Sequence, residues 1–215
     1  MRAVIFANGE LSDYGSVAGL LEPDDLIIAA DGGCRHCLVL GLTPHLVIGD
    51  LDSISPHEMK TLAAANVTVI RHPTRKDQTD LELALALAVE KSADEVLLLG
   101  ALGRRWDMTL ANIMLLAAGS TRADIRLRDG PYEFVLLQGQ DRKVFQGRRG
   151  DGLSLLPLSQ TAEGVTLRGL EYPLDNDTLP LGSTWGISNV FLEDSCEVSL
   201  KEGLLLCVIT RRPKD

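Results

Sequence analysis

The chain has 215 residues, of which 45% are hydrophobic and 24% charged, and its formal net charge at pH 7 is −9. This composition excludes disordered, collagen-like and coiled-coil proteins, and the acidic charge disfavours a nucleic-acid or anionic-membrane partner. A chain of this length can fold without disulfides or metals, and its four cysteines lack the spacing of a disulfide framework.

The first residues predict a buried strand rather than a leader. Met1-Arg2 precedes the apolar run Ala3–Ala7, which lacks the hydrophobic region and cleavage site of a signal peptide. No apolar run in the chain approaches the roughly 20 residues that span a bilayer. We therefore expect a soluble, cytoplasmic protein.

The first half alternates apolar runs of strand length with helical segments. We expect strands at Val4–Ala7, Leu26–Ala30, Leu46–Ile48, Val67–Ile70, Val96–Leu99 and Ile125–Arg128, and helices at Ser16–Leu21, Cys34–Leu40, Pro56–Ala65, Asp80–Lys91 and Asp107–Ala118. Continuous apolar strands are typical of sheets that are buried on both faces. Thr79, with Glu82 three residues later, fits a capping box for the fourth helix. The alternation predicts a parallel sheet covered by helices on both faces.

From Gly130-Pro131 onward the pattern is that of an all-β domain. Short strands are expected at Glu133–Leu137, Lys143–Gln146, Leu153–Leu156, Val165–Leu167, Asn189–Leu192, Glu197–Leu200 and Leu204–Thr210. Turn residues separate them, including Asp175-Asn176-Asp177. We predict an α/β nucleotide-binding domain over residues 1–130, followed by an antiparallel, jelly-roll-like β-sandwich over residues 131–215.

Acidic loops follow several predicted strands, at the end where doubly wound sheets bind ligands. These loops hold Asp31, Asp50, Asp52, Asp77, Asp80 and Asp107. Asp50 and Asp52 are one residue apart, so in an extended loop their carboxylates point the same way. Their repulsion, about 4 kcal/mol at about 4 Å with an effective dielectric constant of about 20, is removed by a divalent cation such as Mg²⁺. With Lys76 and Arg105 to neutralise phosphate, the pattern predicts metal-assisted phosphoryl-type transfer.

Several structural or alternative readings compete with this one. Each aspartate alone is also typical of a turn or a helix cap. Cys34 and Cys37 have the spacing of a redox motif or half a zinc site, but without a second pair we expect small buried residues. Leu46–Asp52 also looks like the strand and Asp-x-Asp of haloacid-dehalogenase-type phosphatases and mutases, in which the first aspartate is a nucleophile. A non-catalytic nucleotide- or vitamin-binding module is the remaining alternative.

A series of segments across both halves matches a known family. They are Asp31–Gly33, Gly49–Ile54, Lys76–Asp80, Gly103–Asp107, Thr109–Asn112, Ser154–Leu158, Gly164–Thr166, Gly169–Leu174 and Gly186–Asn189. In this order they resemble the thiamine pyrophosphokinase (thiamine diphosphokinase) family, nearly end to end. The resemblance implies transfer of a pyrophosphoryl group from ATP to the hydroxyl of thiamine with Mg²⁺, giving AMP and thiamine diphosphate. It also implies a homodimer whose active site lies between the subunits.

The resemblance also implies roles for individual residues. Asp50, Asp52, Asp80 and Asp107 would form the catalytic centre, with the first three as metal ligands, while Asp31, Gly32, Gly33, Lys76 and Arg105 would bind the nucleotide. Tyr172, Ser188 and Asn189 match the family's thiamine-binding segment. Trp185 lies nearby, and an aromatic face suits the cationic thiazolium of thiamine.

Proton removal from the thiamine hydroxyl needs an acceptor, and Asp80 is our first candidate for it. Three positions depart from the family, because Arg104, Met108 and Val190 stand where Gly, His and Glu are common. Met108 and Val190 each remove a polar contact to thiamine or nucleotide, but neither touches the predicted metal centre. We expect activity to survive these changes.

Overall fold

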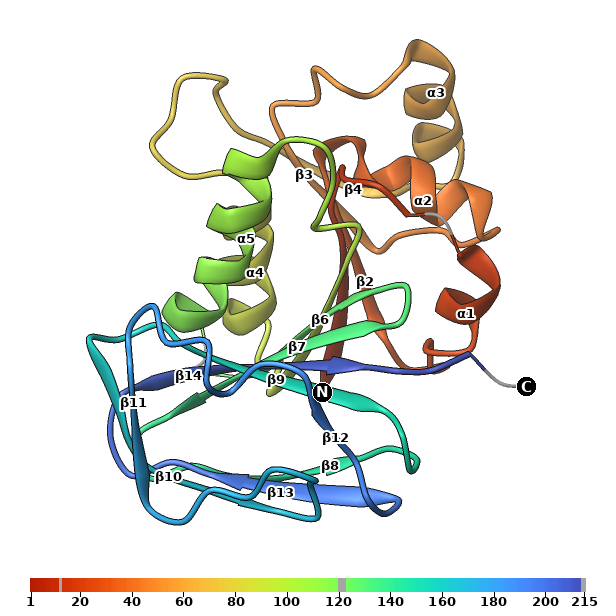
Figure 1. Ribbon diagram of the computed structural model, residues 1–215. Helices are drawn as coiled ribbons and strands as arrows, with labels where there is room; N and C mark the ends of the chain where they lie inside the picture. The colour runs from red at the N-terminus through yellow and green to blue at the C-terminus, as the bar shows by residue number, and fades with distance from the viewer. Residues whose placement is uncertain (12, 120–122, 214–215) are drawn as a thin grey trace. The chain divides into compact units, whose positions relative to one another are not determined.

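The computed structural model describes residues 1–11, 13–119 and 123–213. The chain divides into two compact units, Met1–Gly130 and Pro131–Asp215 (Figure 1). Within the described ranges, no helix is both long and apolar enough to cross a membrane.

The first unit contains a parallel sheet in the strand order β6-β5-β1-β2-β3-β4. Its strands are β1 (Arg2–Phe6), β2 (Leu26–Ala30), β3 (Leu46–Gly49), β4 (Thr68–Arg71), β5 (Glu95–Leu99) and β6 (Asp124–Asp129). All six predicted strands are therefore confirmed. The chain places β2 to β4 on one side of β1 and then returns to place β5 on the other side. The loops that follow β1 and β5 consequently meet at a topological switch point, where open α/β sheets bind ligands.

Helices cover both faces of this sheet, as predicted. They are α1 (Tyr14–Ala18), the short 3₁₀ helix η1 (Asp31–Gly33), α2 (Cys34–Val39), α3 (Pro56–Ala64), α4 (Asp80–Glu90) and α5 (Trp106–Gly119). Figure 1 shows α4 and α5 side by side on one face and α1 to α3 on the other. Half of the capping box predicted for α4 is present: Thr79 Oγ1 accepts a hydrogen bond from the Glu82 N–H at 3.2 Å, but no return bond from the Glu82 side chain is found among the described residues. A reciprocal capping box, which the sequence analysis does not identify, begins α3 at Ser55 and Glu58.

The hydrophobic core of the first unit includes the two cysteines of α2. Cys34 and Cys37 are fully buried and free, and they pack in a cluster with Phe6 and other apolar residues. Burial raises the pKa of the Cys34 thiol to about 11 and that of Cys37 to about 12. Both thiols therefore stay protonated at neutral pH, which confirms the expectation of buried structural cysteines.

Strand β4 corrects one sequence-based expectation. The apolar run Val67–Ile70 predicts a strand buried on both faces, but β4 lies at the end of the strand order and most of its residues are exposed. An edge strand has a neighbour on one side only, so its apolar side chains are covered less than those of the central strands.

The second unit consists of antiparallel strands in the orders β12-β9-β14-β7 and β11-β10-β13-β8. They are β7 (Tyr132–Gln138), β8 (Arg142–Gln146), β9 (Gly152–Pro157), β10 (Thr161–Arg168), β11 (Asp177–Pro180), β12 (Asn189–Val190), β13 (Ser195–Ser199) and β14 (Leu204–Thr210). One core cluster draws buried residues from both sets, such as Leu155 and Val198, so the two sheets face each other. The mixed α/β class is confirmed, whereas the jelly-roll-like arrangement stays a prediction. Strand β11 is not predicted, because only Leu179 of its four residues is buried.

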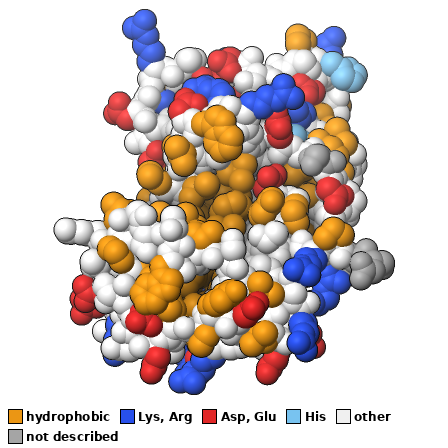
Figure 2. Space-filling view, viewed as in Figure 1, with side chains coloured by type: hydrophobic (Ala, Val, Ile, Leu, Met, Phe, Trp, Pro, Cys, Tyr) orange, Lys and Arg blue, Asp and Glu red, His pale blue; other side chains and the backbone are white. Residues whose placement is uncertain are grey.

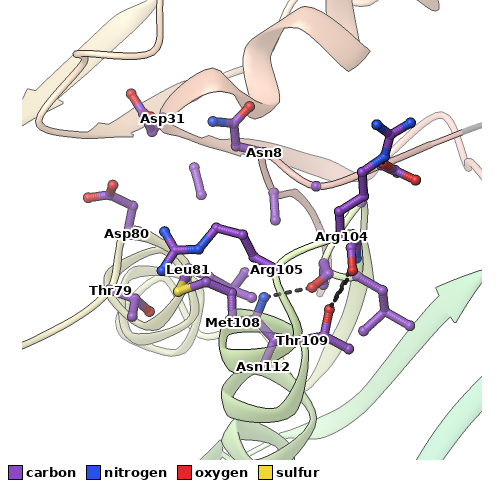
Figure 3. A pocket seen from close by; sticks show the side chains of 18 of the residues that line it. Asn8, Asp31, Thr79, Asp80, Leu81, Arg104, Arg105, Met108, Thr109 and Asn112 are labelled. Carbon is purple, nitrogen blue, oxygen red and sulfur yellow. Dashed lines mark hydrogen bonds and ion pairs between the residues drawn. The ribbon is translucent and has the colours of Figure 1, made fainter.

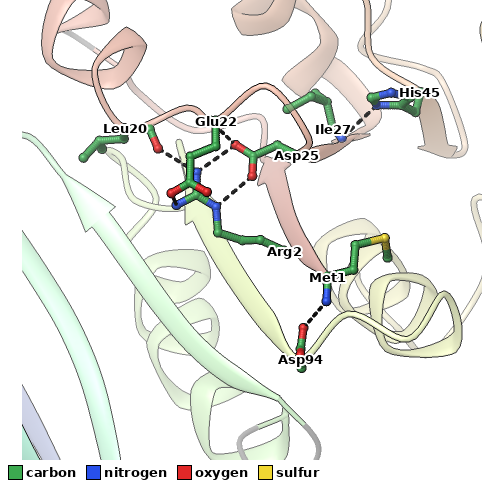
Figure 4. Close-up of polar contacts among 8 residues, drawn as sticks. All are labelled: Met1, Arg2, Leu20, Glu22, Asp25, Ile27, His45 and Asp94. Carbon is green, nitrogen blue, oxygen red and sulfur yellow. Dashed lines mark hydrogen bonds and ion pairs between the residues drawn. The ribbon is translucent and has the colours of Figure 1, made fainter.

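Polar contacts tie together the amino-terminal ends of the parallel strands (Figure 4). Arg2 Nε and Nη2 donate to the two carboxylate oxygens of Asp25 at 2.7 and 2.8 Å. Although burial alone would raise the pKa of Asp25, these bonds and one from the Glu22 N–H hold it below its usual range. The N-terminal amine pairs with Asp94 beside the start of β5. These contacts brace the sheet at the end opposite the carboxyl ends of its strands.

Candidate active site

A pocket of about 480 Å³ lies at the carboxyl ends of the parallel strands in the first unit (Figure 3). It is lined by Ala7–Glu10 after β1, Ala30 and Asp31 at the end of β2, Arg35 of α2, Gly100–Arg105 after β5, and residues of the first halves of α4 and α5. The pocket therefore occupies the switch point between β1 and β5, which is where the strand order predicts a ligand site.

The loop Asn8–Glu10 is a part of this pocket that the sequence analysis did not identify. The Gly9 N–H donates to the Gly100 carbonyl oxygen at 2.7 Å, and the Glu10 N–H donates to that of Leu102 at 2.8 Å. A Cβ atom added to Gly9 would lie only 2.3 Å from the Gly100 oxygen, so this approach requires glycine. The sequence shows a glycine soon after the first strand, which is a sign of a close backbone approach. It does not show that β1 pairs with β5, which brings this loop to the pocket.

Buried polar side chains of α5 hold the loop that follows β5. Thr109 Oγ1 accepts from the Gly103 N–H and donates to the Gly103 carbonyl oxygen, both at 3.1 Å. Asn112 Nδ2 donates to the Ala101 carbonyl oxygen at 2.6 Å, and both contacts are visible in Figure 3. Two residues of the matched segment Thr109–Asn112 thus anchor the wall of the pocket.

Three aspartates gather beside the pocket, and we call Asp31, Asp50 and Asp52 the aspartate cluster. Each offers a carboxylate oxygen, and these oxygens lie within 4.8 Å of one another. Asp31 is only 5% exposed, and among the described residues its Oδ1 has no hydrogen-bond partner. A buried carboxylate oxygen without a partner is costly, and a cation bound beside Asp31 would offset this cost.

The loop between Asp50 and Asp52 is a turn rather than the extended segment predicted from the sequence. Leu51 has φ +69°, a left-handed conformation that is unusual for a leucine, and its side chain is buried in the core of the first unit. The Asp52 N–H donates to Asp50 Oδ1 at 3.1 Å. Burial of Leu51 thus anchors the turn that brings both carboxylates to Asp31.

Asp80 and Lys76 border the aspartate cluster. Lys76 Nζ lies 2.9 Å from Asp80 Oδ1 and 4.0 Å from Asp50 Oδ2, and the Lys76 side chain is 12% exposed. A Cβ atom on Gly49 would lie 3.0 Å from Asp31 Cβ and 3.1 Å from Asp80 Cγ, so both aspartates approach that glycine. Burial raises the pKa of Asp80, as do Asp50 and Asp31, while Lys76 opposes the rise.

Arg105 and Asp107 lie at the exposed start of α5. Arg105 Nη2 pairs with Asp107 Oδ2 at 2.5 Å, and this hydrogen bond lowers the pKa of Asp107. Arg105 lines the pocket, and Figure 3 shows its guanidinium group on the same side as Asp80, with Arg104 on the other. Asp107 is not among the described residues that line it.

The remaining predicted nucleotide residues and two of the three positions that depart from the family lie in the first unit. Gly32 and Gly33 are buried in η1. Arg104 pairs with Glu10 at 2.8 Å in an exposed position, and Met108 lines the pocket.

The predicted thiamine residues all lie in the second unit, in two different environments. Tyr172 and Trp185 are 61% and 62% exposed, and Ser188 is also exposed, with φ +63°. Figure 2 shows hydrophobic side chains exposed among charged ones on the face of the molecule that it draws. Asn189, by contrast, is only 5% exposed and bonds to the backbone of Tyr172. The structure thus exposes both aromatic side chains, and a buried amide supports the backbone of Tyr172.

A buried histidine connects α1, α2 and the loop that follows β1. His36 Nε2 donates to the Gly9 carbonyl oxygen at 3.0 Å, and the Tyr14 hydroxyl donates to Nδ1 at 2.8 Å. In the neutral ring, Nε2 is the donor and Nδ1 the acceptor of this pair of bonds. Burial also lowers the pKa of His36 below its ordinary value of 6.5.

The free energy of unfolding should therefore fall when the protein is acidified through the pKa of an unfolded histidine. Below about pH 6.5 the unfolded chain binds a proton at His36 that the folded chain does not bind, so stability rises with pH in this range. Urea unfolding between about pH 7.5 and about pH 5.5 measures this slope. His36→Gln should show a shallower slope, and an equal slope in both proteins would contradict the assignment.

Comparisons with known proteins match both units. A family model described as "Thiamin pyrophosphokinase, catalytic domain" matches residues 17–127, and one described as "Thiamin pyrophosphokinase, vitamin B1 binding domain" matches residues 143–205. A thiamine pyrophosphokinase of Bacillus subtilis is 32% identical over 205 residues, which cover 95% of this chain and 96% of that protein.

Solved structures give the same result. The crystal structure of thiamine pyrophosphokinase from Bacillus subtilis has a TM-score of 0.89 at 31% identity, covering 99% of this chain and 100% of that one. The thiamin pyrophosphokinase structure from Geobacillus thermodenitrificans has a TM-score of 0.87 at 28% identity, covering 100% and 99%. The similarity extends over the whole of both units.

Proposed function

Because the chain belongs to the thiamine pyrophosphokinase family, and so transfers the pyrophosphoryl group of ATP to thiamine, we propose that its first unit binds ATP and its second binds the vitamin. The observation that carries this division is the aspartate cluster beside the switch-point pocket of the first unit. The exposed Tyr172 and Trp185 of the second unit supply aromatic surface for an organic cation.

We propose that the aspartate cluster holds Mg²⁺. The residues fit this ion, because the cluster offers three hard carboxylate oxygens, and Asp31 Oδ1 is buried with no hydrogen-bond partner in the described part of the chain. Asp50 and Asp52 belong to the predicted metal set, and Asp31 joins them on this evidence. Asp80, the third predicted ligand, lies beside the cluster in its pair with Lys76. When bound, Mg²⁺ neutralises charge on the polyphosphate of ATP.

The protein's own groups orient the substrates around this centre. Lys76, whose ammonium group is already close to Asp80 and Asp50, contributes positive charge to the polyphosphate. Arg105, at the wall of the pocket, adds a second cation. Asp80 is the candidate acceptor for the proton of the thiamine hydroxyl, since it is a carboxylate next to the phosphate-binding groups. The reaction leaves AMP and thiamine diphosphate.

We further propose a homodimer in which the active site is completed between subunits, as the family resemblance implies. The exposed aromatic side chains of Tyr172 and Trp185 support it, because an aromatic surface of this kind commonly contacts a ligand or another chain. Since the phosphoryl donor is ATP, we propose that the enzyme works in the cytoplasm.

A product analysis tests the assignment directly. Purified protein incubated with ATP, Mg²⁺ and thiamine should form AMP and thiamine diphosphate in equal amounts, because the β- and γ-phosphates are transferred together. Separation of the nucleotides by ion-exchange chromatography measures both products. ADP as the nucleotide product, or an absence of turnover at saturating thiamine, would contradict it.

The same assay separates the alternative readings. A haloacid-dehalogenase-type phosphatase would release inorganic phosphate, and a non-catalytic module would bind ligands without turnover. The family matches do not favour either alternative.

A further inference from the structure

The backbone before Tyr172 is held alongside β12. Leu170 and Phe191 form an antiparallel bridge, and both are buried in the core of the second unit. The Glu171 N–H donates to the Val190 carbonyl oxygen at 2.9 Å. The chain therefore reaches Tyr172 from a rigid, paired segment.

At Tyr172, the residue after Glu171, the hydrogen-bond partner of the backbone is a side chain and no longer the backbone of β12. Asn189 Oδ1 accepts from the Tyr172 N–H at 2.9 Å, and Asn189 Nδ2 donates to the Tyr172 carbonyl oxygen at 2.7 Å. The backbone of Asn189 itself is paired with Leu153 of β9. The Asn189 carboxamide thus extends the pairing by one residue and holds both polar groups of the Tyr172 peptide backbone.

The Asn189 amide has little capacity left for a ligand. Its Oδ1 also accepts from the Val190 N–H at 2.9 Å, so both lone pairs of that oxygen are used. The residue is buried, whereas the Tyr172 side chain is exposed. Pro173 disfavours a helical conformation at Tyr172 and so restricts the same backbone from the other side.

We propose that Asn189 is a positioning residue, which holds the Tyr172 ring where it contacts the cationic thiazolium of thiamine, and that the Asn189 amide does not itself bind the vitamin. This inference rests on the proposed function, in which Tyr172 contacts thiamine. It changes the role implied by the family resemblance, since Asn189 acts on the substrate only through Tyr172.

A double-mutant cycle tests the proposal on the full-length enzyme. Asn189→Ala and Tyr172→Ala should each raise the KM for thiamine about tenfold, since a displaced ring loses the same cation contact as a deleted one. The KM for ATP should stay within about twofold, because the pocket of the first unit is untouched. The double variant should match Tyr172→Ala, because Asn189 has no effect once the ring is gone.

The control is Ser159→Ala, which also removes structural hydrogen bonds in the second unit. Ser159 Oγ accepts from the Leu204 N–H at 2.8 Å and donates to the Thr161 carbonyl oxygen. This variant should lower the melting temperature without changing the KM for thiamine. A similar KM increase in Ser159→Ala would mean that general loosening of the unit explains the Asn189 effect, and would overturn the proposal.

Two other outcomes would also overturn it. If the two substitutions act independently, the KM for thiamine of the double variant should rise about a hundredfold. That result would show that Asn189 contacts thiamine directly. An unchanged KM in Asn189→Ala would show that Tyr172 needs no such support. If Asn189→Ala does not fold, Asn189→Asp replaces it in the cycle, since it keeps an acceptor oxygen for the Tyr172 N–H and exchanges the donor to the Tyr172 carbonyl oxygen for a second acceptor. Failure of the wild-type enzyme to form AMP would instead reject the proposed function.

Discussion

Asp50→Asn is expected to lower kcat about a thousandfold or more and to leave the fold intact. If Mg²⁺ bound by the aspartate cluster supplies about 4 kcal/mol of transition-state stabilisation, removing a charged ligand forfeits about three powers of ten. Asparagine keeps an oxygen that can accept the Asp52 N–H, so the local turn is preserved. Steady-state kinetics with AMP as the measured product gives kcat.

Stability should change little in the same variant. The carboxylates of the cluster repel one another by about 3 kcal/mol per close pair at 4.8 Å with an effective dielectric constant of about 20. Loss of this repulsion is offset by loss of the attraction between Asp50 and Lys76. We therefore expect the free energy of unfolding to shift by less than about 1 kcal/mol.

Mg²⁺ titration by calorimetry completes this experiment. The wild type should bind Mg²⁺ more than about tenfold tighter than Asp50→Asn, because the variant keeps only two charged ligands of the cluster. Asp24→Asn, at an exposed aspartate outside the site, is the matched control and should change neither kcat nor Mg²⁺ affinity. A loss of several kcal/mol in stability with normal Mg²⁺ affinity would identify Asp50 as a structural residue.

The fold could be predicted from the sequence wherever burial is strong. The apolar runs Leu26–Ala30 and Leu204–Thr210 coincide with β2 and β14, because each is a central strand whose residues are mostly buried. Prediction failed where burial is partial. β11 has a single buried residue, Leu179, and the apolar β4 turned out to lie exposed at an edge.

The aspartate cluster could be anticipated for a topological reason. Parallel strands end at one edge of a sheet, so acidic residues that follow β2 and β3 meet there whatever the details of the loops. The detail within the cluster could not be anticipated. The left-handed conformation of Leu51 depends on burial of its side chain against residues distant in sequence.

The remaining parts of the site depend on contacts between distant segments. Asn8–Glu10 belongs to the pocket because β5 pairs with β1, and no local pattern reveals that pairing. Asn189 looks like a ligand in a linear motif, yet its hydrogen bonds to Tyr172 span 17 residues. Residue identity thus predicts which chemistry is present, while tertiary pairing decides which residue performs it.

Lys76→Met is expected to lower both stability and turnover, the second largest effect that we predict. The size of the stability loss should depend on Mg²⁺. Methionine keeps most of the side-chain volume but removes the ammonium group that lies 2.9 Å from Asp80 and 4.0 Å from Asp50. Without a metal ion, this takes the paired ammonium group away from two partly buried carboxylates. We expect a loss of about 1–2 kcal/mol, which lowers the melting temperature by about 2–8 °C.

Saturating Mg²⁺ should narrow this difference, because an ion bound by the cluster supplies the missing positive charge. Turnover should stay about a hundredfold below wild type even then, since Lys76 also stabilises charge on the polyphosphate. Melting curves with and without Mg²⁺, and kcat from AMP formation, measure the two effects separately.

Two further variants decide what the lysine contributes. Lys76→Arg keeps the charge and should recover most of the stability but only part of the turnover, because a planar guanidinium cannot reproduce the contacts of an ammonium group. Lys60→Met, at an exposed position of α3, is the matched control and should change neither quantity. An equal loss of melting temperature in Lys76→Met with and without Mg²⁺ would mean that the lysine and the ion do not neutralise the same carboxylates. The proposed metal site at the aspartate cluster would then have to be abandoned.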